Sequence, residues 1–233
     1  MVNDHKNTGT PGIGIYSTAT RVAGISALAF AAGVIVANLS VAGAPMADAT
    51  AGEAESWYLE NSWRMILANS MVALTFPAIL AFGAAMYELA RDQAAARFWM
   101  LLGAFGAVSM VGVFSILVAG NISSVLFADN GGDLFALAWT IHNAAFAINM
   151  SILGTAFFGF SMGAYSAGLT PSWLRTVGLT GATLLLITGF GNTIVAGGSP
   201  VAFVGFAGFI LWMIWLVTTG FKLMRRPAVQ RLS

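Results

Sequence analysis

The segment AWTIHNAAFAIN, residues 138–149, places one histidine and two asparagines in a stretch of sequence that is otherwise apolar. On a helix, Trp139, His142, Phe146 and Asn149 fall on one face, because residues three and four positions apart are neighbours there. An imidazole in such a place can accept a proton, bind a ligand or haem iron, or complete a structural hydrogen bond. His142 is therefore the first candidate for chemistry in this chain.

Three interpretations of His142 stay open at this point. The first interpretation is a haem ligand. A haem would need a second axial ligand, and the other histidine of the chain lies outside every apolar segment. A proton or ligand contact is the second interpretation, and a hydrogen-bonded structural histidine is the one that we favour. We predict a candidate polar site within the membrane, formed by His142, Asn149, Asn143, Asn69 and Trp139.

The sequence offers little other chemistry. It has no cysteine, which excludes disulfides, iron–sulfur clusters and thiolate zinc sites. It has no HExxH, GxSxG or Walker-type glycine motif, no lysine within a span that could hold retinal, and no paired acidic residues for coupled proton transport. We therefore predict no catalytic residue, no metal and no cofactor, and expect contacts with lipid.

The elements that position these residues are membrane helices. Of 233 residues, 58% are hydrophobic and 8% are charged, which is too little charge for a surface facing water. A membrane helix needs about 20 mainly apolar residues. The sequence predicts an all-α bundle of six transmembrane helices at residues 22–43, 64–88, 98–120, 134–165, 174–196 and 201–222.

The charged residues predict the orientation of the bundle. If both termini lie on one side, that side holds nine of the ten basic residues, whereas the opposite side holds most of the acidic ones. The positive-inside rule then places both termini in the cytoplasm and the chain in the bacterial cytoplasmic (inner) membrane. We expect a cytoplasmic N-terminal segment at 1–20, the transmembrane domain at 21–224 and a basic tail at 225–233. The first apolar stretch is longer than that of a signal peptide, so we expect it to stay attached.

The loops and spans carry three further patterns. Trp57, Tyr58 and Trp63 in the long acidic outer loop predict a helix at the level of the lipid headgroups, and Arg64 beside them is expected to pair with Glu60 or another loop acid. Small residues at Gly159 and Gly163, and at Ala29 and Gly33, predict close helix packing. The asparagines near the outer ends of the odd-numbered spans indicate either a repeated hairpin or, as we favour, a shared way to end a helix; they are Asn38, Asn121 and Asn192.

One stretch carries a resemblance to a known family. The sequence YSAGLTPSWLRTVGL, Tyr165 to Leu179, is similar to a cytoplasmic turn in a family of bacterial membrane proteins of unknown function with about six spans. The segment MYELARDQAAARFWMLLGAF in the first cytoplasmic loop fits the same pattern, and the resemblance covers about residues 60–225. It implies the six-span topology and no particular activity.

For function, the favoured hypothesis is a non-enzymatic accessory or scaffold subunit that packs against a larger membrane complex or forms a homo-oligomer. It follows from the lack of reactive groups and the many small and aromatic residues. The first alternative is a pore or carrier for a small neutral or apolar solute, which would need a cavity at Asn69, His142 and Asn149. The second alternative is a membrane enzyme or redox protein that depends on His142. The expected partners are membrane lipids and protein, and not nucleic acid.

Overall fold

The computed structural model describes residues 11–129 and 131–226. These residues form eight α-helices and no strand. The helices are α1 (Pro11–Ser40), α2 (Ala51–Glu60), α3 (Ser62–Ala90), α4 (Ala94–Phe127), α5 (Asp133–Ser166), α6 (Ser172–Phe190), α7 (Asn192–Ala196) and α8 (Ala202–Met224). Six of them, all except α2 and α7, are long and apolar enough to cross a membrane, so the predicted all-α, six-span fold is confirmed.

The predicted spans differ most from the structure in three places. The first helix begins at Pro11, before the expected start, and α4 continues past residue 120 to Phe127. The predicted span 174–196 is divided into α6 and the short α7, because the chain turns at Gly191. Of the predicted N-terminal segment and basic tail, residues 1–10 and 227–233 lie outside the described residues.

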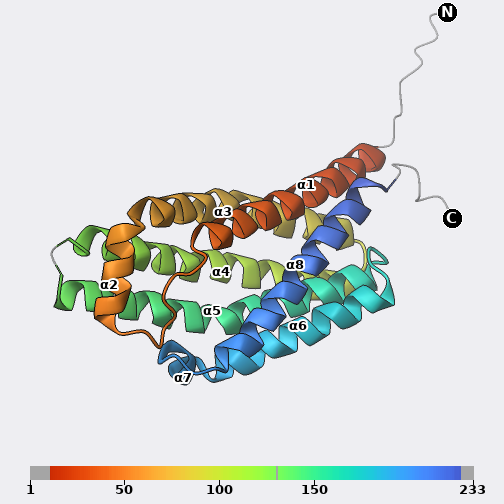
Figure 1. Cartoon of the computed structure of the whole chain (residues 1–233). Helices are drawn as coiled ribbons and strands as arrows, with labels where there is room; N and C mark the ends of the chain where they lie inside the picture. Colours follow the sequence, from red (N-terminus) through yellow and green to blue (C-terminus); the bar gives the residue numbers. More distant parts are fainter. Residues whose placement is uncertain (1–10, 130, 227–233) are drawn as a thin grey trace, which may run out of the picture.

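The six long helices form a ring. Going round it, α1 packs beside α3, then come α4, α5, α6 and α8, and α8 returns to α1 (Figure 1). The start of α1 and the end of α8 lie at the same end of the bundle, which we call the basic end, and α2 covers the other, the α2 end. An even number of membrane crossings brings both ends of the chain to one side, as this arrangement has them. That this side is the cytoplasm stays a prediction.

Glycines allow the closest helix packing. A Cβ atom at Gly106 on α4 would lie 2.7 Å from the backbone of Ala156 on α5, and one at Gly163 would lie 2.8 Å from the Met100 side chain. Gly159 likewise meets the backbone of α4, and Gly33 on α1 lies against Thr75 on α3. The close packing predicted at Gly159 and Gly163 is therefore confirmed, whereas at the second face it holds for Gly33 and not for Ala29, which is exposed.

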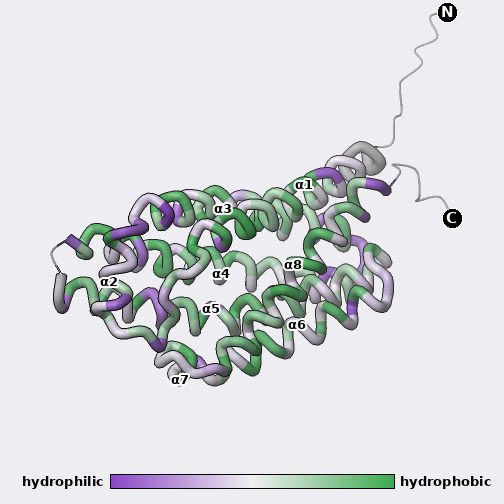
Figure 2. Tube along the Cα trace, in the orientation of Figure 1, coloured by the Kyte–Doolittle hydropathy of each residue, from purple (hydrophilic) through white to green (hydrophobic). Residues whose placement is uncertain are grey.

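The interior of the basic half is filled by aromatic side chains. The ring centroids of Phe82 and Phe160 are 5.0 Å apart, those of Phe157 and Trp212 are 4.8 Å apart, and Trp212 stacks on Trp215 at 5.9 Å. We call these five residues the aromatic floor. Figure 2 shows hydrophobic residues along the middle of the long helices and hydrophilic ones gathered near the two ends, as expected for a bundle in lipid.

The helix predicted in the long outer loop is α2, and its aromatic residues are not all at its surface. It begins with a capping box, in which the Glu53 N–H donates to the Thr50 hydroxyl and the Thr50 N–H donates to the Glu53 carboxylate. Trp63, just after α2, is 65% exposed, but Tyr58 is only 2% exposed. The prediction that Tyr58 lies among lipid headgroups is therefore wrong, because α2 turns this ring inward onto α4 and α5.

Candidate functional site

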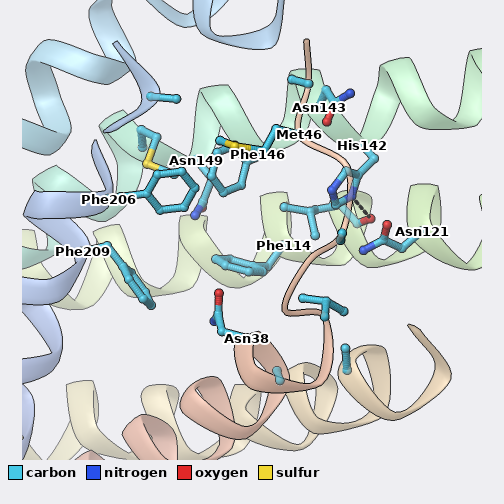
Figure 3. Close-up of a pocket in the computed structure, with 18 of the residues that line it drawn as sticks. Asn38, Met46, Phe114, Asn121, His142, Asn143, Phe146, Asn149, Phe206 and Phe209 are labelled. Carbon is cyan, nitrogen blue, oxygen red and sulfur yellow. Dashed lines mark hydrogen bonds between the residues drawn. The ribbon is translucent and has the colours of Figure 1, made fainter. Parts of the chain in front are cut away.

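The bundle contains a cavity of about 380 Å³ in its α2 half. Side chains from α1, α3, α4, α5 and α8 line it, and residues of the loop between α1 and α2 cover it (Figure 3). All five residues of the predicted polar site are in its wall: His142, Asn149, Asn143, Asn69 and Trp139. Tyr58, Asn38 and Asn121 line it as well. The structure thus brings the predicted residues together, and their binding of a ligand stays a prediction.

His142 is held by α4 and turned towards this cavity. Its Nδ1 lies 3.2 Å from the backbone oxygen of Leu117. Because a carbonyl only accepts hydrogen bonds, Nδ1 carries the hydrogen, and Nε2 of the neutral ring is left as an acceptor. The imidazole stacks on Trp139 with an interplanar angle of 17°, and Gly120 lets the backbones approach at this point. The structural hydrogen bond that we expected is present.

Asn149 has no comparable partner. Its side chain is 2% exposed, and its Oδ1 is buried without a hydrogen-bond partner. The Nε1 of Trp212, at the side of the cavity nearest the aromatic floor, is buried and unpaired too. The side chains of Asn69 and Asn143 line the same space and make no hydrogen bond within the described part of the chain. Unpaired polar groups inside a membrane bundle are costly, so this cavity is suited to a molecule that can hydrogen-bond to them.

Tyr58 and Asn121 close the α2 side of the cavity. The Tyr58 hydroxyl donates to Asn121 Oδ1 at 2.6 Å, and the Tyr58 ring packs edge-on against Phe135 and Trp139. Burial raises the pKa of Tyr58 above its ordinary value, which keeps the hydroxyl protonated as a donor. This contact ties α2 to α4 across 63 positions of the sequence.

The three asparagines compared in the sequence do not share one role. Asn38 is in the last turns of α1 and donates to the Val34 carbonyl at 2.9 Å, and Asn192 begins α7. Asn121 lies within α4, well before its end, so the prediction that it ends a helix is wrong. Its spacing from Phe114 and Leu117, which precede it by seven and four residues, indicates that the three side chains share one helix face. That face lines the cavity.

Arg64 holds the segment that leads into the cover of the cavity. Its guanidinium donates to the backbone oxygens of Ser40 at 2.7 Å and Ala42 at 2.8 Å, and to Asn61 Oδ1 at 3.1 Å. The predicted ion pair with Glu60 or another loop acid is therefore wrong. The carbonyls at the end of α1 have no helical partners and carry the negative end of the helix dipole, so they attract this cation instead.

The lining is neutral apart from one side chain. Asp48, in the covering loop, is the only charged residue among the described residues that line the cavity. Within residues 11–129 and 131–226, no group of three histidine, cysteine or acidic side chains is placed to hold a metal ion. What these residues can do chemically is hydrogen-bond to a neutral molecule and surround its apolar part.

Comparison with known proteins identifies a family. Residues 22–220 match the model of a family described as a domain of unknown function, DUF4386. The resemblance to a six-span membrane family of unknown function is thereby confirmed. No curated protein and no solved structure matches the chain.

Proposed function

Since the chain belongs to the DUF4386 family, described as a domain of unknown function, we propose its function from its own cavity. The protein is a multi-pass membrane protein that binds a small neutral, mainly apolar solute between its helices and acts as a carrier for it. The observation that carries this proposal is the group of unpaired polar atoms in the cavity wall, with Asn149 as the clearest case.

Several features support this proposal. The cavity volume of about 380 Å³ lies in the range of small-molecule sites, which are mostly apolar with a few convergent polar groups. The aromatic floor fills the basic half, so the cavity does not continue as an open pore. A cavity that is blocked on one side is expected in a carrier that binds its solute before it changes conformation.

The experiment that tests this function fills the cavity. Ala68 on α3 is 6% exposed and lines the cavity, whereas Ala73 on the same helix faces outward. The probe is 4-bromophenol, added to protein in phosphatidylcholine vesicles, where its bromine quenches the fluorescence of any tryptophan that it contacts. We expect saturable quenching in the wild type and in Ala73→Phe, and its loss in Ala68→Phe. Equal saturable quenching in both variants, or none in the wild type, would contradict the proposal.

The other hypotheses stay predictions. A role as an accessory or scaffold subunit would need a partner surface, and the exposed apolar side chains on the long helices, such as Leu74 and Phe105, are accounted for by lipid. A base or redox role for His142 would need a reacting group beside Nε2. Location in the bacterial inner membrane rests on the charge distribution alone.

A further inference from the structure

The cavity is closed towards the basic end. Trp212 lines it there, and its ring packs against Phe157 and stacks on Trp215. Phe157, Trp212 and Trp215 are fully buried, and Phe82 and Phe160 complete the same layer. A solute cannot pass this floor without displacing several aromatic rings.

The cavity is also covered at the α2 end. Pro45, Met46 and Ala47 of the loop between α1 and α2 are part of its wall. Gly198 of the turn before α8 lies so close to this loop that a Cβ atom there would be 2.5 Å from the Cα of Asp48. Together with the Arg64 contacts to Ser40 and Ala42, this packing seats the loop over the cavity.

The side between α1 and α8 is different. Near the basic end the two helices touch, since a Cβ atom at Gly24 would lie 3.0 Å from the Gly220 backbone oxygen. Towards the α2 end they diverge (Figure 1), and the cavity wall there is made of Val34 and Asn38 on α1 and Phe203 and Phe206 on α8. We call this gap the α1–α8 opening. Asn38 is exposed and Phe203 is 60% exposed although both line the cavity, so the wall reaches the outer surface of the bundle here.

The polar atoms inside set the hydrogen-bonding requirement. His142 Nε2 is an acceptor without a protein donor, since the ring uses Nδ1 on Leu117, and the Oδ1 of Asn149 is buried and unpaired as well. The side-chain amide of Asn38 donates to the Val34 carbonyl, so its oxygen is a further acceptor. This side chain lies beside the α1–α8 opening and points into the cavity (Figure 3). A ligand that satisfies these acceptors must donate a hydrogen bond, and its own oxygen can accept one from the unpaired amide N–H groups that line the same cavity. We expect it to be uncharged, because Asp48 is the only charged side chain among the described residues that line the cavity.

We infer that the ligand is a neutral, mainly apolar molecule with a hydroxyl donor, such as a phenol or a lipid-soluble alcohol, and that it enters sideways from the bilayer through the α1–α8 opening. This inference rests on the proposed function. Such a molecule dissolves in the hydrocarbon region of a bilayer, and the opening lies between α1 and α8, two helices long and apolar enough to cross it. Phe203, Phe206 and Phe209 give its apolar body a path past α8, and the acceptors inside bind its hydroxyl.

The ligand class is tested with a matched pair of probes in phosphatidylcholine vesicles. 4-Bromophenol and 4-bromoanisole share a brominated ring, but only the phenol donates a hydrogen bond. Because the anisole leaves buried acceptors unpaired, we expect it to bind about tenfold more weakly in the saturable quenching of the cavity tryptophans. Trp63 and Trp173 face outward and report the probe dissolved in the bilayer, so both probes should quench them alike. Equal affinity of the two probes in the cavity would overturn the hydroxyl requirement.

The route is tested by closing the opening. Val41 follows Asn38 by three residues and also lines the cavity. The natural chain has no cysteine, so Val41→Cys with Phe203→Cys can be joined by reducible bis-methanethiosulfonate linkers of several lengths. The saturable phase of 4-bromophenol quenching reports binding in the cavity. We expect this phase to slow by about tenfold in the linked protein and to recover when the linker is reduced. A bulky maleimide on the single variant Phe203→Cys needs no second site and should slow the same phase. Each single variant treated with the linker is the control.

The outcomes separate the two proposals. If the unlinked protein binds 4-bromophenol and both the linked and the maleimide-labelled proteins bind it equally fast, the sideways route is wrong while the proposed function stands. If the wild type shows no saturable phase at all, the proposed function itself fails.

Discussion

Asn149 and Asn121 are the same residue type in opposite situations, although both are buried at the cavity. The amide oxygen of Asn121 accepts a hydrogen bond from Tyr58, whereas that of Asn149 has no partner. Removing a satisfied polar group loses a hydrogen bond and leaves its partner unpaired, whereas removing an unsatisfied one relieves a desolvation cost. The two positions therefore predict opposite responses to the same substitution.

We expect Asn149→Leu to raise the free energy of unfolding of the unliganded protein by about 1 kcal/mol, because it removes a buried unpaired amide. Asn121→Leu should lower it by about the same amount, because the Tyr58 hydroxyl is left without an acceptor. Denaturant unfolding in detergent measures both. Asn149→Leu should also weaken saturable binding of 4-bromophenol. A loss of stability in both variants would show that Asn149 is satisfied in the folded protein.

At the scale of elements, α2 is held by the packing of the Tyr58 ring and by one long-range hydrogen bond. Tyr58→Phe keeps the ring between Phe135 and Trp139 but removes the donor to Asn121. We expect faster hydrogen exchange of the amides of residues 51–60 and little change in the spans, because the contact holds α2 rather than the ring of helices. In the double variant Tyr58→Phe, Asn121→Leu no acceptor is left unpaired, so part of the protection should return. Unchanged exchange in Tyr58→Phe would mean that ring packing alone holds α2.

The existence of the six spans could be predicted from the sequence, because their length and apolarity are a direct requirement of the bilayer. The order of the ring could not. Every face of a membrane helix is apolar, so hydrophobic periodicity does not say which face turns inward. Small residues give part of that information, as at Gly159 and Gly163. The predicted face of His142 and Asn149 could be read because polar residues stand out in such a helix.

The rest of the site depends on contacts that no local pattern specifies. Tyr58 has the composition of a headgroup anchor, and only the packing of α2 on α4 and α5 shows that it is buried. Arg64 is close to several acids in the sequence, yet the end of α1, which is more than twenty residues away, provides its acceptors. Both errors arise because side chains at the membrane edge can turn to water, lipid or protein at similar cost.

At the scale of the whole molecule, the two ends of the bundle differ in charge, and this difference predicts the orientation. The loop after α3 carries Arg91 and the start of α6 carries Arg175, whereas α2 carries Glu53 and Glu55. Basic loops are retained on the cytoplasmic side, so the α2 end should face outward. The cover of the cavity would then lie on the outer side, and the aromatic floor would separate the solute from the cytoplasm.

Single cysteines in this cysteine-free chain test that orientation directly. Gly52 in α2 and Gln93 in the α3–α4 turn are both exposed, and a Cβ atom at Gly52 would meet no atom within 4 Å. In intact cells, a membrane-impermeant maleimide should label Gly52→Cys at once and Gln93→Cys only after lysis. The natural sequence, which has no thiol, gives the background. The reverse pattern would place the cover of the cavity in the cytoplasm, and a carrier of this form would then bind its solute from the inner side of the membrane.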